Sequence, residues 1–554
     1  MLAISFYCDV LSSNLAAATP TCVRDKRLDQ IKIISNSLSA MMYLIVLLIV
    51  IPIVFYLYGV KNYSYWKKRG VKHDDPVPYL GNNVKQYTQR ASMAMTATDV
   101  YRRYPEEKIV GFYRGTSPEL VIRDLDIAKR ILMTDFHHFY PRGLLTHKTV
   151  IEPLLKNLFF ADGDLWRLLR HRITPAFSSG KLKAMFPYIT ERAEKLTIVA
   201  EEYAANKTVC DVRDLMARYT TDFIGVCGFG INMDSLSEDN SEFRKLGKRI
   251  FHRTPRDALC AVLKHVFPEM FKNFNLLSPE IEESMVHLVN TVLKQRDYKP
   301  SGRHDFIDLM LELKQSGTMV GESIEERNPD GTPKIVKLDL DDLLITAQVF
   351  VFFGAGFETS SSASSYTLHQ LAFNPEYQEK VQKEIDEVLA QHDNKITYQA
   401  VKEMTLLEMA FNEGMRMYPS VGFLIRECAT NNYTIPEVDV TISKGVKVII
   451  PIQAYHNDEK YFPNPEQFIP ERFTPEAKKN IPHYAYLPFG EGPRACVGAR
   501  LGQMQSMAGL AAVLQKFTFE PAANSKKVPT PDPKAIVSEN IVGGLPLLIK
   551  KRNL

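Results

Sequence analysis

One cysteine lies in a loop whose composition suits a metal ligand. The segment PFGEGPRACVGARLG, residues 488–502, places Cys496 after a turn rich in glycine and proline and before an apolar stretch. Glycine adopts backbone conformations closed to other residues, so amide groups in such a loop can turn toward the sulfur. A thiolate at the N-terminal end of the helix expected from Gly498 is also favoured by the helix dipole. The alternative is a buried cysteine in a glycine-rich turn.

A second candidate for chemistry lies inside a long apolar segment. The stretch DDLLITAQVFVFFGAGFETSSSASSYTLHQLAFNP begins in an acidic cluster at residues 339–342, which suits a helix N-terminus, and ends at Pro375. A helix of roughly 33 residues would be about 50 Å long, enough to cross a domain. Within it, Glu358 and Thr359 could relay protons. The alternative is a threonine whose hydroxyl only bonds back to a carbonyl of its own helix.

The spacing around the cysteine points to a family. The positions Phe489, Gly492, Arg494, Cys496 and Gly498 follow F-x-x-G-x-R-x-C-x-G. This pattern resembles the cytochrome P450 family, the haem-thiolate monooxygenases, in which it is highly specific. The resemblance implies haem b as cofactor, Cys496 as the proximal iron ligand and Phe489 as part of the cofactor-binding loop. A thiolate ligand pushes electron density onto iron, which favours O–O cleavage.

The resemblance also assigns roles within the long helix. The segment AGFET, residues 355–359, is similar to the distal-helix motif of the family. It implies that glycine lets the helix open for oxygen, and that Glu358 and Thr359 deliver protons at the face opposite Cys496. The substrate would be held mainly by apolar burial above the haem. Its candidate contacts are Phe352, Phe353, Ala355, Val421 and Phe423.

Several cations match partners of the haem propionates in this family. Trp166 and Arg170, in the segment WRLLR, lie one helical turn apart and can point the same way. Arg426 and Arg494 match further propionate partners, and Arg142 in FYPRG is another candidate. An arginine beside a carboxylate makes a charge-assisted pair. Exposed cations are the alternative for Arg426 and Arg142.

A third motif has a structural role in the family. Glu413 and Arg416 lie at i and i+3 and can pair on one helix face. The resemblance implies that they join Arg472, in the segment PERF, in a buried network that supports the haem-binding side. We therefore exclude these three residues from the catalytic set.

An uncharged apolar segment near the N-terminus predicts a membrane anchor. Residues 41–60, MMYLIVLLIVIPIVFYLYGV, are long enough to cross the roughly 30 Å core of a bilayer. The flank after it is basic and the flank before it, IISNSLSA, is not, so the rest of the chain should face the cytosol. The family resemblance implies that the membrane is that of the endoplasmic reticulum. A buried core helix is the alternative. The basic residues are Lys61, Lys67, Lys68, Arg69 and Lys72.

The remaining chain predicts one mainly helical domain with small β-sheets, the cytochrome P450 fold. We divide the sequence into an extension at 1–40, the anchor at 41–60, a basic, proline-containing linker at 61–83 and a haem domain at 84–554. Translation starting at Met41 or Met42 would explain the extension. The clearest strand-like runs are VKVIIPI and LPLLIKK, and the polar segment 315–334 is predicted to be an exposed loop.

Composition excludes several function classes. The 68 basic and 64 acidic residues nearly balance, so nothing indicates nucleic-acid binding. Seven cysteines without C-x-x-C pairs argue against a zinc or disulfide framework. Small buried thiols are expected at Cys210, Cys227, Cys260 and Cys428.

Electrons must come from another protein, because the glycine pairs near 228 and 354 lack the strand-to-helix context of a nicotinamide-binding fingerprint. The resemblance implies NADPH–cytochrome P450 reductase as donor, with cytochrome b5 as a second one. A docking patch is predicted from Arg167, Arg170, His171, Arg172, Lys181 and Lys183; the alternative is that some of these are internal or solvated.

The finer motifs look most like the insect family-six branch of clan three. These are GAGFETSS, MRMYPSVGFLIREC and AYHNDEKYFPNPEQFIPERF. This resemblance implies a membrane-anchored monooxygenase that uses NADPH and O2 to oxidise lipophilic small molecules, xenobiotics such as plant toxins or insecticides. Hormone or fatty-acid metabolism is the nearest alternative. A haem-thiolate isomerase or dehydratase and a non-enzymatic haem sensor are further ones.

Overall fold

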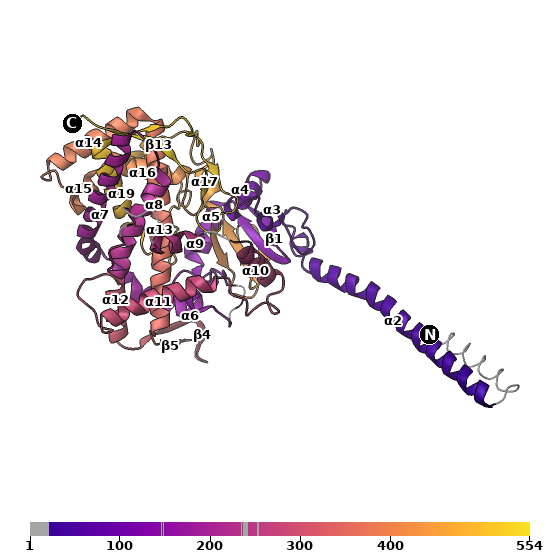
Figure 1. Ribbon diagram of the computed structural model, residues 1–554. Helices are drawn as coiled ribbons and strands as arrows, with labels where there is room; N and C mark the ends of the chain where they lie inside the picture. The colour runs from indigo at the N-terminus through magenta and orange to yellow at the C-terminus, as the bar shows by residue number, and fades with distance from the viewer. Residues whose placement is uncertain are drawn as a thin grey trace. The chain divides into compact units, whose positions relative to one another are not determined.

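The computed structural model describes residues 21–145, 147, 149–233, 235–236, 242–251 and 254–553, without the side chains of 21–28 and 242. The chain divides into two units, Met1–Asn62 and Tyr63–Leu554, each described by itself. The first twenty residues of the expected extension lie outside the described residues. Figure 1 shows the ribbon of both units.

The first unit contains one long helix, α2 (Thr21–Val60). It begins well before Met41, where the sequence analysis started the anchor, because residues 21–40 contain neither proline nor glycine to interrupt a helix. Residues Asp29–Val60 are long and apolar enough to cross a membrane, and none of their most apolar window is buried. Helix α2 therefore fits a membrane anchor, and its exposure does not support the core-helix alternative.

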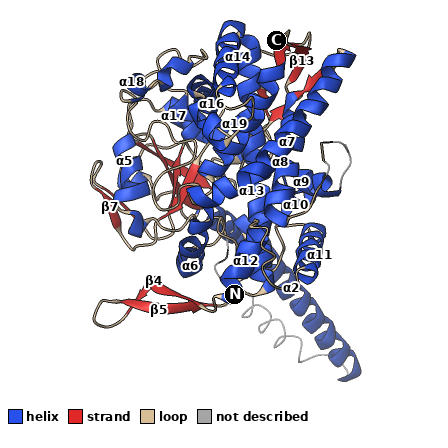
Figure 2. Cartoon of the chain, turned by 90° about the vertical axis from the view of Figure 1, so that its left-hand side faces the viewer, coloured by secondary structure: helices blue, strands red, loops and turns tan. Residues whose placement is uncertain are grey.

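The second unit is mainly helical, with small sheets at its periphery (Figures 1 and 2). From Tyr63 onward it includes the segment expected as a linker: Trp66 is fully buried, and its indole Nε1 donates to the carbonyl of Phe112 at 3.1 Å. The helices are α3 (Val84–Tyr87), α4 (Met93–Arg103), α5 (Leu125–Lys129), α6 (Gly163–Ile173), α7 (Ser179–Asn206), α8 (Val212–Ile224), α9 (Glu242–Phe251), α10 (Pro255–Val266), α11 (Pro279–Gln295), α12 (Phe306–Gln315), α13 (Asp342–Phe373), α14 (Pro375–Ala390), α15 (Tyr398–Glu403), α16 (Thr405–Met417), α17 (Ile452–His456), α18 (Pro475–Lys478) and α19 (Ala499–Lys516).

Helix α13 passes through the middle of this body and packs against α8, α16 and α19 (Figure 1). Its start is fixed by Asp341, whose carboxylate accepts a hydrogen bond from the amide of Leu344 at 2.6 Å. It ends at Phe373, just before Pro375 begins α14. The long helix expected from the sequence is confirmed, and most of its apolar window is buried, as a core helix requires.

The larger sheet has the strand order β1-β2-β9-β6 and covers one side of the helices. Strand β9 runs parallel to β2 and antiparallel to β6. A second sheet has the order β10-β13-β3. The two strand-like runs of the sequence form β9 and β13, as predicted. The strands of both sheets are β1 (Ile109–Arg114), β2 (Ser117–Ile122), β3 (Val209–Asp211), β6 (Leu424–Glu427), β9 (Lys447–Ile450), β10 (Phe517–Pro521) and β13 (Pro546–Lys551).

Small strand pairs complete the body. The loop prediction for residues 315–334 is wrong: β4 (Met319–Arg327) pairs antiparallel with β5 (Pro333–Leu338). The NPDG turn at 328–331 closes this hairpin, and Gly331 supplies the positive φ of 85° that the turn needs. Figure 2 shows the hairpin projecting beside α6. The remaining pairs are β7 (Tyr433–Ile435) with β8 (Val440–Ile442), and β11 (Thr530–Pro531) with β12 (Ile541–Val542).

Candidate functional site

The cysteine loop is a tight turn that ends at α19. The amide of Cys496 donates to the carbonyl of Phe489 at 2.8 Å, and the amide of Ala495 to that of Gly492 at 2.9 Å. Gly492 has a φ of +78°, and a Cβ there would lie 2.0 Å from the carbonyl oxygen of Leu132. Only glycine fits this position. Helix α19 starts directly after Gly498, so Cys496 precedes the helix N-terminus, as the sequence predicts.

Cys496 keeps accessible surface, yet protein atoms surround its thiol closely enough to shift the pKa. Cys496 is exposed, whereas Cys210, Cys227, Cys260 and Cys428 are buried, which confirms the expectation for those four. Burial among protein atoms nevertheless raises the pKa of the Cys496 thiol. The Gly498 amide, which donates to the sulfur, and the cations Arg170 and Arg142 act in the opposite direction. Cys496 thus keeps accessible surface, while the Gly498 amide and the two cations favour its thiolate form.

Arg494 is the centre of a cation cluster beside this loop. Its guanidinium donates to the carbonyls of Tyr140 at 2.6 Å and Ala161 at 3.0 Å, and it pairs with Asp162 at 2.9 Å. Its charge also lies 4.2 Å from the centroid of the Trp166 ring. Trp166 and Arg494, named separately from the sequence, are therefore in direct contact.

Arg142 and Arg426 join the same cluster. Arg142 donates to the carbonyls of Phe159 at 2.9 Å and Arg494 at 3.2 Å. Arg426 is 1% exposed, so the exposed-cation alternative is wrong for it. Burial, followed by the charge of Arg142, lowers the pKa of Arg426 to about 9 and that of Arg494 to about 8. Burial also lowers the pKa of Arg142 to about 10.

This cluster suits a group with two carboxylates. After burial, the charges of Arg142, Arg426 and Arg170 lower the pKa of Arg494, and the carboxylate of Asp162 acts in the opposite direction. Among the described residues, the buried Nε of Arg426 has no hydrogen-bond partner. Buried cations are stable only when paired, so this excess positive charge calls for an anionic ligand. A ligand with two carboxylates would meet that demand.

On α13, Ala355 is exposed although its neighbour Phe353 is fully buried. The hydroxyl of Thr359 donates to the Ala355 carbonyl at 2.7 Å, the backbone contact considered as the alternative to a relay. Gly356 has a packing role: a Cβ there would lie 2.3 Å from Ile224 Cδ1 of α8. Glycine at this position therefore allows α13 and α8 to approach closely.

Glu358 has a different partner from Thr359. Its buried carboxylate forms an ion pair with Arg213 of α8, and Arg213 also donates to the hydroxyl of Ser361 at 3.1 Å. The sequence analysis did not identify Arg213, although a buried glutamate requires a cation from somewhere. Proton delivery by Glu358 would require this ion pair to open.

The substrate candidates divide into two groups. Phe352 stacks on Phe306 with ring centroids 4.4 Å apart, and Phe353 packs against Phe243 at 4.4 Å. Of the five candidates, only Phe353 is fully buried, whereas Phe352, Ala355, Val421 and Phe423 keep accessible surface. The hydroxyl of Ser420 donates to the Thr359 carbonyl at 2.9 Å, which joins the 420–423 loop to α13.

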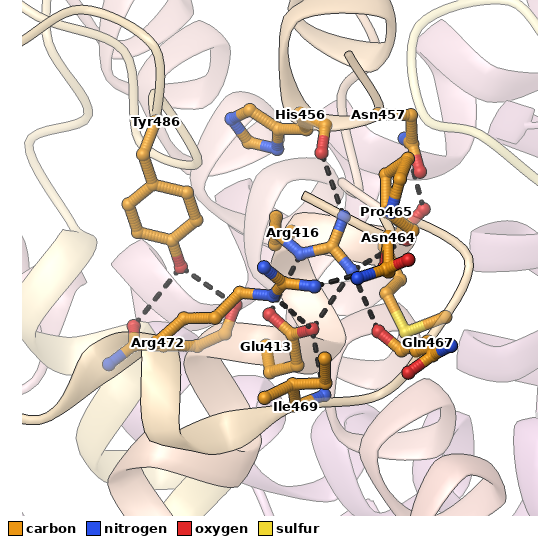
Figure 3. Close-up of polar contacts among 12 residues, drawn as sticks. Glu413, Arg416, His456, Asn457, Asn464, Pro465, Gln467, Ile469, Arg472 and Tyr486 are labelled. Atoms are coloured by element: carbon orange, nitrogen blue, oxygen red, sulfur yellow. Dashed lines mark hydrogen bonds and ion pairs between the residues drawn. The ribbon is translucent and has the colours of Figure 1, made fainter. Parts of the chain in front are cut away.

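The buried network around Glu413 is confirmed (Figure 3). Arg416 contacts both carboxylate oxygens of Glu413 at 2.8 and 2.9 Å, and Arg472 approaches the same carboxylate at 3.4 Å. Arg416 also donates to the carbonyl of His456 at 2.8 Å. The His456 ring in turn accepts from the amide of Leu487, two residues before Phe489, at 2.8 Å. The network therefore supports the start of the cysteine loop.

A surface hollow of about 440 Å³ lies beside the cysteine loop. It is lined by Trp166, Arg167, Arg170, His171, Thr174, Pro175 and Pro493. Arg167 pairs with Glu322 of β4 at 3.5 Å, and Lys181 lies 3.9 Å from Glu312. The hollow thus collects three of the six cations named for the docking patch.

Known proteins share this sequence over most of its length. The chain matches the profile of the cytochrome P450 family over residues 72–542. It is 37% identical over 497 residues to cytochrome P450 6B7 of Helicoverpa armigera, covering 89% of this chain and 96% of that protein. It is 38% identical over 523 residues to cytochrome P450 6a2 of Drosophila melanogaster, covering 92% and 100%. It is 38% identical over 487 residues to cytochrome P450 6B1 of Papilio polyxenes, covering 88% of this chain and 95% of that protein.

These matches confirm the resemblance to insect family-six proteins, the helical fold and haem as cofactor. The chain belongs to the cytochrome P450 family and is a haem-dependent monooxygenase.

Proposed function

We propose that this monooxygenase uses NADPH and O2 to oxidise lipophilic foreign compounds such as plant toxins or insecticides. The observation that carries the proposal is an accessible Cys496 sulfur between the N-terminus of α19 and the buried arginines. Membership of the family supplies the reaction class, and similarity to insect family-six proteins supports the substrate class. Hormone or fatty-acid oxidation is the nearest alternative.

Each residue has a defined task in the cofactor site. Cys496 would ligate the iron, and Phe489 would close the loop beside it. Trp166, Arg170, Arg426 and Arg494 would hold the propionates, which supply the negative charge that the cluster lacks. When bound, haem activates O2 and transfers one oxygen atom to the substrate. The Gly498 amide limits the electron density that the sulfur donates, because it hydrogen-bonds the same atom.

Proton delivery is assigned to two residues of α13, Glu358 and Thr359. The Thr359 hydroxyl now donates to the Ala355 carbonyl, and rotation about its Cα–Cβ bond would present it to the accessible surface near Ala355. Glu358 would supply protons once its ion pair with Arg213 opens. This distal pair favours oxygen activation over a haem-thiolate isomerase or dehydratase and over a haem sensor, since none of these needs proton delivery to O2.

Electrons would come from NADPH–cytochrome P450 reductase, with cytochrome b5 as a second donor. The cationic hollow beside Pro493 supports docking of an acidic partner near the cysteine loop. The apolar helix α2 and the basic residues after it support anchoring in the endoplasmic reticulum membrane with the catalytic unit in the cytosol.

The test is reconstitution of the full chain with reductase in lipid vesicles. A panel of lipophilic plant compounds, insecticides, steroids and fatty acids is added, and NADPH consumption and oxygenated products are measured. Turnover confined to the first two classes supports the proposal. Turnover of steroids or fatty acids alone would favour the endogenous alternative. Product formation without NADPH would indicate an isomerase or dehydratase, and haem binding without product a sensor.

A further inference from the structure

The β4–β5 hairpin is attached to the first turn of α6. Asp164 of α6 accepts two hydrogen bonds from β4, one from the Ile324 amide and one from the Ser323 hydroxyl, both at 2.7 Å. Ser323 is fully buried, and its oxygen also accepts from the amides of Glu325 at 3.0 Å and Glu326 at 2.7 Å. Figure 2 shows the hairpin and α6 side by side.

In a second contact between the hairpin and α6, the donor lies on α6 and the acceptor on β4. Glu325 accepts from the Asp164 amide at 3.3 Å and from the Tyr140 hydroxyl at 3.2 Å. The amides of a first helical turn have no partners within the helix and need acceptors from elsewhere. A negative charge is favoured at that end of the helix. The side chain of Asp162, at the N-cap position, instead accepts from the amides of Arg142 and Gly143. The hairpin therefore supplies the acceptor that caps α6.

The same short helix carries contacts to the cofactor site. Asp162, directly before α6, pairs with Arg494, and Trp166 lies against the Arg494 guanidinium. Arg170, one turn further, acts on the pKa of the Cys496 thiol. Asp162, Trp166 and Arg170 all lie within six residues of Asp164 in the sequence. A tilt of α6 at its first turn would move the Asp162 and Trp166 contacts together.

We propose that Asp164 and Ser323 form a latch by which the β4–β5 hairpin positions α6, and through α6 the arginine cluster that holds the haem carboxylates. Both are positioning residues, since they act through Asp162, Trp166 and Arg494. The inference rests on the proposed role of that cluster in haem binding. It gives a function to a hairpin that lies outside the catalytic residues.

Haem loss from the full-length holoprotein tests the latch directly. Transfer of haem to excess apomyoglobin is followed by absorbance for the wild type, Asp164→Ala, Ser323→Ala and Asp164→Asn. Each hydrogen bond contributes about 1 kcal/mol, or about fivefold in rate. Asp164→Ala, which removes both bonds to the hairpin, should therefore lose haem about thirtyfold faster, and Ser323→Ala, which removes one of the two, about fivefold faster. Asp164→Asn keeps an oxygen for the Ile324 amide and should recover much of the loss. Glu326→Gln, on the same hairpin but paired at 2.8 Å with Lys334, is the matched control and should match the wild type.

A double-mutant cycle separates positioning from general destabilisation. If Asp164 acts through Arg494, Asp164→Ala should add little haem loss in an Arg494→Lys background. Full additivity, or haem loss at the wild-type rate in both Asp164→Ala and Ser323→Ala, would overturn the latch. Arg494→Lys alone tests the cluster: unchanged haem loss there would reject its proposed role in binding. Should Asp164→Ala not yield folded protein, Ser323→Ala and Glu325→Ala decide by the same criteria.

Discussion

The two sides of the cofactor site are held in different ways. On the cysteine side, Glu413, Arg416 and His456 form a fully buried chain of contacts that reaches the loop through the Leu487 amide. On the α13 side, the Thr359 hydroxyl bonds within its own helix, and Glu358 is tied to α8 by one ion pair. The cysteine side is therefore rigid, whereas the side proposed to deliver protons can rearrange by breaking few contacts.

This difference matches what each side must do. A thiolate ligand needs one fixed geometry, and a buried network held by several hydrogen bonds provides it. Proton delivery needs a hydroxyl and a carboxylate that change partners during turnover. Substitutions on the cysteine side should therefore damage structure or cofactor binding, and those on the α13 side should damage the use of electrons.

The largest effect is expected at the ligand itself. Cys496→Ser should abolish the strongly red-shifted Soret band of the reduced, carbon monoxide-treated protein, because that band requires a thiolate on iron. Absorption spectra of membranes containing the full chain measure it. Cys260→Ser, which changes a buried thiol, should retain the band. Retention in Cys496→Ser would refute the assignment of the ligand.

Breaking the Glu413 network should cause the next largest loss. Glu413→Ala leaves the buried guanidinium of Arg416 without its carboxylate, which should cost about 3–5 kcal/mol of unfolding free energy. Denaturant unfolding of the holoprotein measures this cost. Glu387→Ala, which removes an exposed ion pair with Lys383, should change it by less than about 0.5 kcal/mol. Equal effects in both variants would contradict the conclusion that the Glu413 network holds the cysteine side rigidly.

On the α13 side, Thr359→Ala should leave stability and the carbon monoxide spectrum intact. Product formed per NADPH consumed should fall by about a hundredfold, the lower end of the roughly 10²–10⁴-fold contribution of a positioned proton donor. Parallel assays of NADPH, oxygen and product give the ratio, and Thr359→Ser should restore it. Normal coupling in Thr359→Ala would remove this residue from the relay.

A smaller effect should appear with pH on the cysteine side. Burial, followed by the charge of Arg416, lowers the pKa of His456 from 6.5 to about 3. Below pH 6.5 the His456 ring binds a proton in the unfolded chain, whereas in the folded protein it stays neutral down to about pH 3. Stability should therefore fall by about 1.4 kcal/mol per unit as pH drops through this window.

His456→Gln tests that pH dependence, because the side-chain oxygen of glutamine can still accept from the Leu487 amide but does not titrate. The variant should lose this part of the slope in denaturant unfolding measured between pH 6.5 and pH 5. His287→Gln, at an exposed position, serves as the control and should keep the wild-type slope. An unchanged slope in His456→Gln would show that the histidine is protonated in the folded protein.

The parts of the fold predicted well are those encoded by local patterns. The acidic cluster at 339–342 and Pro375 mark the two ends of α13, and the cysteine motif places Cys496 before α19. The hairpin at 319–338 was missed because charged residues dominate its alternation, so the segment reads as a polar loop. Its stability comes from Asp164, which lies 155 or more residues earlier in the chain.

The sequence by itself determined the family, the cofactor and the apolar N-terminal helix, because short motifs and long apolar runs carry that information. Only the tertiary structure decided which charges meet. It paired Glu358 with Arg213, brought Arg142, Arg426 and Arg494 from three separate segments into one cluster, and set the hairpin against α6. The physical reason is desolvation: a buried charge must find a partner, and its distance in space is independent of its distance along the chain.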